Sequence, residues 1–285
     1  MDYKLIASDL DGTLFDSHGR LSEENSRAIS ELSSLGVHFV PASGRTLADI
    51  PDAVRNHPSV RYVIYSSGAV VFDKETGKRI SFCFPAELSR GVLEMLFSVE
   101  SHISVRRFGK TYVDRRHLNP ESFSYYNVWK VHSDLLMDYA YPIDDFCQVT
   151  LSFDNVEMIS AFFKNDDDLE RIRKKLSADS RLNVVSACAH NLEIIFKEAE
   201  KGRALAALAD MLSVPISETV AVGDSENDIS MIKAAGLGLA MENAGDVVKK
   251  QADKVICHCN DHAIRFIKEN IYVRTYQRLV ISYYW

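Results

Sequence analysis

Two acidic residues directly follow a short apolar run near the N-terminus, and they limit the folds open to this chain. The run Leu5–Ala7 predicts a buried strand, and Asp9-Leu10-Asp11-Gly12-Thr13 comes after it. Because alternate side chains of a strand point the same way, Asp9 and Asp11 can face one small crevice. Carboxylates this close repel unless a cation or a shared proton lies between them, and carboxylate oxygens suit magnesium. The structural alternative is an Asp-Gly turn that closes a hairpin.

A second acidic segment, Gly223 to Asp228, follows another apolar run and opens a helical stretch. The carboxyl ends of parallel strands share one edge of a sheet, so we expect Asp9 and Asp224 to converge on one ion. Asp228 lies one helical turn after Asp224, where it can orient a metal-bound water or a neighbouring ligand. Asn227 is neutral and can donate a hydrogen bond to an oxyanion without adding repulsion.

A hydroxyl group and an ammonium group complete this set of polar side chains. Ser43-Gly44-Arg45 follows the strand predicted by Phe39-Val40, and Ser43 can donate to a phosphoryl oxygen through its side chain and its backbone. Lys201 opens a helical pattern, and its charge can neutralise a phosphate that faces several acids. Taken singly, these residues have structural explanations: a loop, a solvated helix start and, for Asp224, a helix cap. Together they favour a site for phosphate and metal.

The four segments resemble the motifs of the haloacid dehalogenase (HAD) superfamily of aspartyl-phosphate phosphatases, within it the Cof-type group (subclass IIB). They are Asp9 to Leu14, Ser43 to Arg45, Lys201-Gly202 and Gly223 to Asp228, and the resemblance runs from Leu5 to about Ile267. It implies an α/β fold with a Rossmann-like parallel-sheet core and an inserted α+β cap domain of the C2B type. It also implies a magnesium-dependent hydrolase that removes phosphate from small phosphorylated metabolites, with sugar phosphates as the favoured class.

The resemblance assigns a role to each matching residue. Asp9 would be the nucleophile that becomes phospho-aspartate, and Asp11 would act as the general acid and then the general base. Mg²⁺ would bind the Asp9 carboxylate, the Asp11 backbone carbonyl and the Asp224 carboxylate. Asp228 would support these groups without touching the substrate. The residues expected to bind phosphate or substrate are Leu10, Ser43, Gly44, Arg45, Lys201 and Asn227.

A non-catalytic phosphate-binding or phospho-accepting sensor module is the alternative function. Asp11 distinguishes the two, because a sensor needs a phosphoryl acceptor and a metal but no acid for a leaving alcohol. A large inserted domain also favours catalysis, since a lid excludes water and selects the substrate.

Three segments depart from the pattern of the family. Ser67-Gly68-Ala69 stands where the family usually has Asn-Gly-Ala, and Lys197-Glu198-Ala199-Glu200 replaces a run with a proline and small residues before Lys201. In Met241-Glu242-Asn243-Ala244, Glu242 stands where the family has glycine. None of these departures falls on the predicted nucleophile or metal ligands.

Alternating strand and helix patterns in the first part of the chain predict a parallel sheet with right-handed crossovers. The first helix is expected to begin after a cap at Ser22, to bury Ala28, Ile29, Leu32 and Leu35, and to end at Gly36. The segments that continue the pattern are a strand over 37–40, a helix over about 47–56 and a strand over 62–65.

From about Phe84 the pattern changes to that of an inserted α+β domain. Helices are predicted over about 88–96 and from Asp166, and strands over about 103–107, 111–113, 147–153, 156–163 and 182–186. The core is expected to resume with the strand Leu192–Phe196. The predicted domains are therefore a first part of the core (1–83), the inserted cap (84–190), a second part of the core (191–270) and an aromatic tail (271–285). Packing on the core, self-association and loose order are all open for this tail.

Several other motifs favour structural explanations. Cys257-His258-Cys259 lacks a second ligand pair at zinc spacing and is expected at a strand end. Asp166-Asp167-Asp168 suits the positive end of a helix dipole. Gly109-Lys110-Thr111 lacks the earlier glycine of a phosphate-binding loop, so we expect a hairpin turn. Most of the aromatic cluster Phe123, Tyr125, Tyr126 and Trp129 is expected in the core, with one or two members exposed.

Composition excludes some partners. The chain has 285 residues, 46% of them hydrophobic, which suits about two packed domains. Its net charge of −7 provides no basic surface for nucleic acid, so small anionic substrates must be attracted locally by the metal and Lys201. No apolar run is long enough to cross a membrane, and charged residues interrupt the N-terminus where a signal peptide would need an apolar stretch. Five irregularly spaced cysteines argue against a disulfide framework, and a cytoplasmic enzyme is expected.

Overall fold

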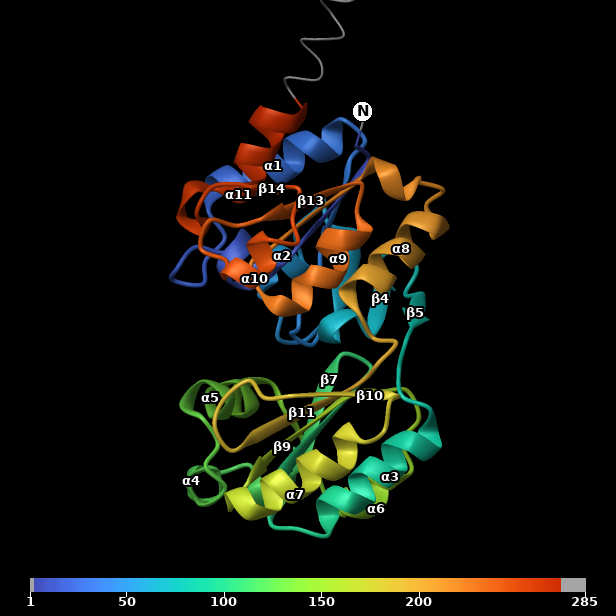
Figure 1. Cartoon of the computed structure of the whole chain (residues 1–285), viewed down its shortest axis with the longest axis vertical. Coiled ribbons are helices and arrows are strands. Elements are labelled where there is room, and N and C mark those ends of the chain that lie inside the picture. The colour runs from blue at the N-terminus through green and yellow to red at the C-terminus, as the bar shows by residue number, and fades with distance from the viewer. Residues whose placement is uncertain (1–2, 273–285) are drawn as a thin grey trace, which may run out of the picture. The chain divides into compact units, whose positions relative to one another are not determined.

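The computed structural model describes residues 3–272, and these residues form two compact units (Figure 1). The first unit, called the core, takes its described residues from 1–44, 50–80 and 200–285. The second, called the inserted unit, comprises 45–49 and 81–199. The predicted tail lies outside the described residues from 273 onward, while Tyr272 is buried and its ring lies 6.4 Å from that of Tyr3.

The core is built on a five-stranded sheet in the order β14-β13-β12-β1-β2, and all of its strand pairs are parallel. Its elements are β1 (Leu5–Ser8), α1 (Glu23–Ser34), β2 (His38–Pro41), α2 (Asp52–Arg55), β3 (Tyr62–Tyr65), β4 (Val70–Asp73), β5 (Arg79–Ser81), α8 (Lys201–Met211), β12 (Thr219–Gly223), α9 (Ile229–Ala234), β13 (Leu237–Ala240), α10 (Asp246–Lys249), β14 (Lys254–Val255) and α11 (Ala263–Ile267). The central strands β1 and β12 are buried along their whole length, because helices cover both faces of the sheet. Helices α1 and α11 lie on one face and α8 and α9 on the other (Figure 1).

The residues predicted to begin and end the first helix are confirmed. The Ser22 side chain accepts a hydrogen bond from the backbone N–H of Asn25, and Gly36 adopts a left-handed φ of 80° just after the helix. Ala28, Ile29 and Leu32 are buried against the sheet. Leu35, which we expected on this face, is 53% exposed because it lies at the C-cap, where the helix has ended.

Two predictions for the segment after β2 are wrong. Helix α2 covers only Asp52–Arg55 instead of 47–56, because Pro51 cannot lie in a helix interior and begins the helix instead. Strand β3 pairs antiparallel with β4 in a separate three-stranded sheet, β3-β4-β5. Its link to the preceding strand is a single parallel bridge between Ala42 and Ile64.

The inserted unit has a six-stranded sheet in the order β10-β11-β9-β6-β7-β8, antiparallel except between β7 and β8. Its elements are α3 (Ala86–Phe97), β6 (Ser101–Arg107), β7 (Lys110–Asp114), α4 (Pro120–Tyr125), α5 (Lys130–Tyr139), β8 (Tyr141–Ile143), α6 (Phe146–Leu151), β9 (Val156–Phe163), α7 (Asp166–Ser177), β10 (Leu182–Val185) and β11 (Asn191–Phe196). Apolar side chains of α3, α6 and α7 pack with one face of this sheet in a common core. The described chain thus has the predicted class, a parallel α/β core with an inserted α+β unit.

Two assignments near this unit are corrected. The strand Leu192–Phe196 does not resume the core, because β11 pairs with β9 and β10 inside the inserted unit, which extends to residue 199. Residues 147–151 of the segment 147–153 belong to helix α6 rather than to a strand, with Phe146 and Thr150 buried. At the other boundary, the inserted unit begins at 81 rather than 84 and includes 45–49.

The remaining motifs are structural. Phe108 and Gly109 form the turn between β6 and β7, as expected for a hairpin. Asp166 to Asp168 occupy the first turn of α7. Cys257-His258-Cys259 follows β14 and, within the described residues, belongs to no group of clustered metal-ligating side chains. Of the aromatic cluster, Phe123 is buried, whereas Tyr125 and Trp129 are 45% and 55% exposed. No helix within residues 3–272 has the length and apolar character of a membrane span.

Candidate active site

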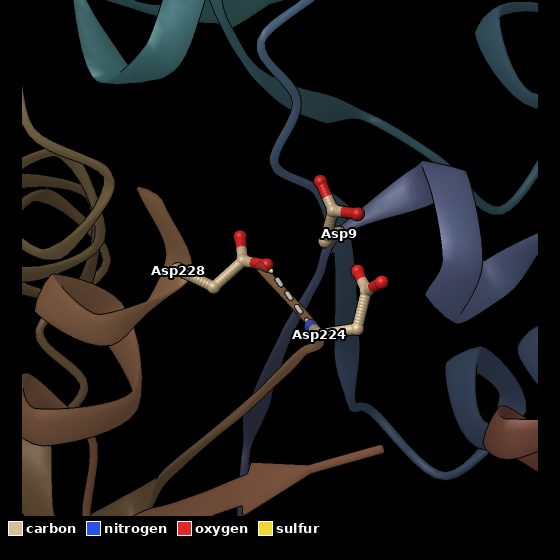
Figure 2. Close-up of side chains that lie close together, drawn as sticks. All are labelled: Asp9, Asp224 and Asp228. Carbon is tan, nitrogen blue, oxygen red and sulfur yellow. Dashed lines mark hydrogen bonds between the residues drawn. The ribbon is translucent and has the colours of Figure 1, made fainter. Parts of the chain in front are cut away.

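Asp9 and Asp224 stand at the ends of adjacent parallel strands. The register of β1 on β12 pairs Ser8 with Val222, and the N–H of Asp9 continues this ladder by donating to the Val222 carbonyl at 3.0 Å. Asp9 is 6% exposed and Asp224 is half-buried. Figure 2 shows their side chains converging with that of Asp228. One carboxylate oxygen from each of the three lies within 4.8 Å of the others.

The turn after Asp9 brings its backbone against Asp224. Gly12 has a left-handed φ of 76°, and a Cβ atom there would lie 2.4 Å from Oδ2 of Asp224. Only glycine fits both the conformation and the space. The hydroxyl of Thr13 donates to Oδ1 of Asp224 at 3.3 Å. Leu10 is buried beneath this turn, whereas the side chain of Asp11 is exposed.

Lys201 is completely buried and joins two of the acids. Its Nζ lies 2.7 Å from Oδ1 of Asp9 and 2.5 Å from Oδ1 of Asp228. The other oxygen of Asp228 accepts hydrogen bonds from the backbone N–H groups of Asp224 and Ser225, at 3.1 and 3.0 Å. Both oxygens of Asp228 are therefore occupied by protein groups, as expected for a residue that supports the site without binding substrate.

Burial and repulsion between carboxylates shape the protonation of this group. Burial raises the pKa of Asp9, and the charges of Asp228 and Asp224 add to this rise while Lys201 opposes it. Burial and then Asp228 raise the pKa of Asp224 in the same way. For Lys201, burial favours loss of the proton, but Asp228 and Asp9 outweigh it and raise the pKa of the ammonium. The cluster is therefore short of positive charge.

The same group suits a divalent cation. Three ionised carboxylates and one ammonium carry a formal charge of −2, which a divalent ion balances. Because Asp228 is committed to Lys201 and to the backbone, Asp9 and Asp224 are the two residues whose carboxylates can turn to an ion. Oxygen donors of this kind match Mg²⁺. The Asp11 carbonyl as a third ligand stays a prediction.

Gly44 lies close to two of the other segments. A Cβ atom at Gly44 would lie 3.4 Å from the Ser67 hydroxyl oxygen and 3.8 Å from Nδ2 of Asn227. Ser43 is buried beside it. One expectation for Ser43 is wrong: its backbone N–H donates to the Ile64 carbonyl at 2.9 Å, so this N–H is not directed at a phosphate.

Arg45 belongs to a different environment from the other predicted residues. It begins the short segment 45–49 that groups with the inserted unit, where the N–H of Ala48 donates to the Gly109 carbonyl at 3.1 Å. The Arg45 guanidinium donates to the Asp49 carbonyl at 3.1 Å, which holds this segment in a loop. A contact between Arg45 and a substrate stays a prediction.

The turn 66–68 supports the site in a way that the sequence did not indicate. Ser66, Ser67 and Gly68 have consecutive positive φ values of 48°, 56° and 95°. A Cβ atom at Gly68 would lie 2.3 Å from the carbonyl carbon of Glu200. The turn is therefore packed directly on the peptide that precedes Lys201. The glycine in Ser67-Gly68-Ala69 was visible in the sequence, but the peptide that it contacts was not. The side chain of Glu200 itself is exposed.

Asn243 was seen in the sequence only as part of a four-residue pattern, yet it contacts the site directly. Its Nδ2 donates to the Gly12 carbonyl at 2.8 Å and lies 3.4 Å from Oδ2 of Asp224. The neighbouring Glu242, which replaces a glycine of the family pattern, points its side chain to solvent and donates its N–H to the Cys257 carbonyl. The replacement is therefore accommodated at the surface.

A family model described as haloacid dehalogenase-like hydrolase matches residues 6–267. The chain belongs to this family. The matched residues include all of the side chains described above.

Named relatives of this haloacid dehalogenase-like hydrolase are phosphatases. It is 31% identical to phosphatase YwpJ of Bacillus subtilis (strain 168), over 94% of this chain and 99% of the relative. A second Bacillus subtilis protein, 5-amino-6-(5-phospho-D-ribitylamino)uracil phosphatase YcsE, is 29% identical over 90% of each chain. The solved structure of TM0651 from Thermotoga maritima superposes with a TM-score of 0.80 at 27% identity and covers 94% of this chain and 97% of that one. The protein is a phosphatase of the Cof-type group.

Proposed function

We propose that this enzyme hydrolyses small phosphorylated metabolites, foremost sugar phosphates, with Mg²⁺ and through a phospho-aspartate at Asp9. The observation that carries this proposal is the buried ion pair of Lys201 with Asp9, together with the carboxylate oxygens of Asp9 and Asp224 that lie within 4.8 Å of each other. Lys201 holds Oδ1 of Asp9 at 2.7 Å, and we propose Oδ2 as the attacking oxygen. A carboxylate that is fixed through one oxygen is a suitable nucleophile for phosphorus.

In the proposed first step, an oxygen of Asp9 forms a bond to phosphorus and the bond from phosphorus to the ester oxygen breaks. Asp11 gives its proton to the departing alcohol oxygen, which suits the exposed position of its side chain at the turn. Lys201, the hydroxyl of Ser43 and the amide of Asn227 are proposed to hold the phosphoryl oxygens and offset their charge.

In the second step, Asp11 removes a proton from water, and the water oxygen attacks the phosphorus of phospho-aspartate. The bond between phosphorus and the Asp9 oxygen breaks, which releases inorganic phosphate and restores the carboxylate. Bound between Asp9 and Asp224, Mg²⁺ would supply the positive charge that lets a phosphate dianion lie beside carboxylates. Asp228 keeps Lys201 in place through the 2.5 Å contact with its ammonium.

The substrate class rests on a relative and on the inserted unit. The named substrate of YcsE is a phosphorylated ribityl compound, which supports a polyhydroxylated leaving alcohol for this chain. We propose that residues 81–199, with the segment 45–49, act as the cap that excludes water and selects this alcohol. Such metabolites are cytoplasmic, and this is where we expect the enzyme to act.

A panel of phosphorylated metabolites assayed with Mg²⁺ tests the proposal. We expect phosphate release from sugar phosphates by the wild-type protein, none by Asp9→Asn, and none by the wild-type protein in excess chelator. Asp114→Asn is the matched control, because it neutralises a buried carboxylate of the inserted unit and should keep activity. Turnover by Asp9→Asn would refute the nucleophile. A single phosphorylation of Asp9 without repeated release of alcohol would favour the sensor alternative.

A further inference from the structure

Asn243 connects three segments that come together at the acidic cluster. Its Nδ2 donates to the Gly12 carbonyl at 2.8 Å, in the turn after Asp9, and reaches Oδ2 of Asp224 at 3.4 Å. Its Oδ1 accepts the N–H of Cys259 at 3.0 Å. A carbonyl can only accept and a backbone N–H can only donate, so these partners fix the orientation of the Asn243 amide.

The backbone holds Asn243 at the same sheet edge as Asp224. It lies just beyond β13, in a turn closed by a hydrogen bond from the Ala244 N–H to the Met241 carbonyl at 3.1 Å. The N–H of Met241 donates to the Gly223 carbonyl at 3.0 Å and so ties this turn to the end of β12. The backbone at Asn243 is therefore fixed to the end of β12, and from there its amide reaches the turn that follows β1.

The contacts that orient Asp224 are long. Its carboxylate accepts from the Thr13 and Ser225 hydroxyls at 3.3 Å each and from Asn243 at 3.4 Å. The bond from Asn243 to the Gly12 carbonyl, at 2.8 Å, is the shortest of those that Asn243 makes. Gly12 has no side chain to fix its peptide, and its left-handed backbone lies directly against Asp224. A single amide thus restrains both the turn after Asp9 and the carboxylate of Asp224.

We propose that Asn243 is a positioning residue for the divalent cation: it holds the Gly12 peptide and the Asp224 carboxylate where an ion between Asp9 and Asp224 would bind. This inference rests on the proposed magnesium dependence. Loss of the amide leaves the Gly12 peptide without its restraint and lets Asp224 turn away. Part of the free energy of ion binding is then used to order both groups, so the affinity for the ion falls. Removing a hydrogen bond of this kind corresponds to about a tenfold loss of affinity.

Titration with MgCl₂ alone tests this role, with the unfolding temperature and calorimetry as readouts that need no substrate. Mg²⁺ should raise the unfolding temperature of the wild-type protein, because an ion that binds only the folded state stabilises it. We expect Asn243→Ala to need about ten times more Mg²⁺ for the same effect. At saturating Mg²⁺ its kcat and KM should return to within about twofold of wild type, as expected for a residue that acts through the metal.

The matched control is Asn119→Ala in the inserted unit. Asn119 also makes one donated and one accepted backbone hydrogen bond, to the Arg116 carbonyl at 2.7 Å and from the Ser122 N–H at 2.9 Å. Its substitution should leave the Mg²⁺ titration unchanged. If Asn243→Ala does not fold, Asn243→Ser keeps a hydroxyl at this position and should weaken Mg²⁺ binding in the same direction.

Each outcome is decisive. Equal Mg²⁺ affinity in Asn243→Ala and wild type would overturn the inference, as would a kcat that stays low at saturating Mg²⁺. If the wild-type protein itself shows no response to Mg²⁺ and no phosphatase activity, the proposed function fails rather than the role of Asn243 alone.

Discussion

Lys201 and Asp9 form a buried ion pair, with 2.7 Å between Nζ and Oδ1, although 192 positions of sequence separate them. The same ammonium contacts Asp228 at 2.5 Å. One cation thus balances two carboxylates that would otherwise repel, and it does so where the nucleophile of the proposed reaction must be held still.

Lys201→Met should remove activity and stability together. The substitution leaves Asp9 and Asp228 buried without their cation, which typically destabilises a protein by about 3–5 kcal/mol. Urea unfolding in the presence of chelator measures this change. The double variant with Asp228→Asn has one carboxylate fewer and should recover part of the stability but no activity. If Lys201→Met unfolds at the same urea midpoint as the wild-type protein, that result would contradict the ion pair as described.

Gly12→Ala should damage the site beyond the effect of its backbone conformation. Gly12 and Gly19 have similar φ values of 76° and 74°, but a Cβ atom meets Asp224 at Gly12 and open space at Gly19. Each substitution destabilises the fold by about 1–2 kcal/mol, because alanine disfavours the left-handed conformation. Gly12→Ala also displaces Asp224. We therefore expect Gly19→Ala to keep phosphatase activity and Gly12→Ala to lose it. Equal activity of the two variants would show that Asp224 is not in contact with this turn.

Ser67→Asn should stabilise the protein. Ser67 has a φ of 56°, a conformation that asparagine adopts more readily than serine. A gain of up to about 1 kcal/mol is expected, since the penalty for other residues is about 1–2 kcal/mol. Ser98→Asn is the control, because Ser98 has an ordinary φ of −80°. Chemical denaturation that ranks Ser67→Asn at or below Ser98→Asn would argue against strain at this turn.

Acid should weaken the fold through Asp73. Two bonds from Arg61 and the N–H groups of Glu75 and Thr76 lower the pKa of Asp73 from 3.8 to about 2. A carboxylate whose pKa is lower in the folded state stabilises the fold above its unfolded value, and this contribution disappears as the pH falls from about 4 to about 2.

The stability difference between wild type and Asp73→Asn should therefore be constant near neutral pH and shrink over this acidic range. Urea midpoints measured from pH 6 to pH 2 give this difference. Asp138→Asn on the exposed side of α5 should show no such trend. If this stability difference does not change with pH, the ion pair between Asp73 and Arg61 is not its source.

Much of the site could be predicted because its residues follow buried strands. Asp9 and Asp224 both come directly after short apolar runs, and parallel pairing of β1 with β12 brings those ends together. Lys201 was predictable as the start of a helix, but its complete burial was not, since the segments that surround it, such as the turn 66–68 on the preceding peptide, are distant in sequence. Asn243 was recognisable as part of a pattern, while its hydrogen bonds depend on the ends of three separate segments.

The errors in the fold arise where several structures satisfy the same local pattern. Leu192–Phe196 is a buried apolar strand in either unit, and only its long-range partners β9 and β10 place it in the inserted unit. The segment after Phe146 contains β-branched residues that favour a strand, but burial of Phe146 and Thr150 on one face selects a helix. Tertiary contacts decide both cases.

The turn at Gly68 has a mechanical consequence. The chain leaves the inserted unit at residue 199, so Lys201 is only the second residue after the crossing and would follow any shift of the strand that leads into it. Gly68 lies so close to the peptide between Glu200 and Lys201 that no side chain fits between them. We therefore expect this contact to fix the backbone at Lys201, so that a larger residue at position 68 would displace the ammonium that balances Asp9.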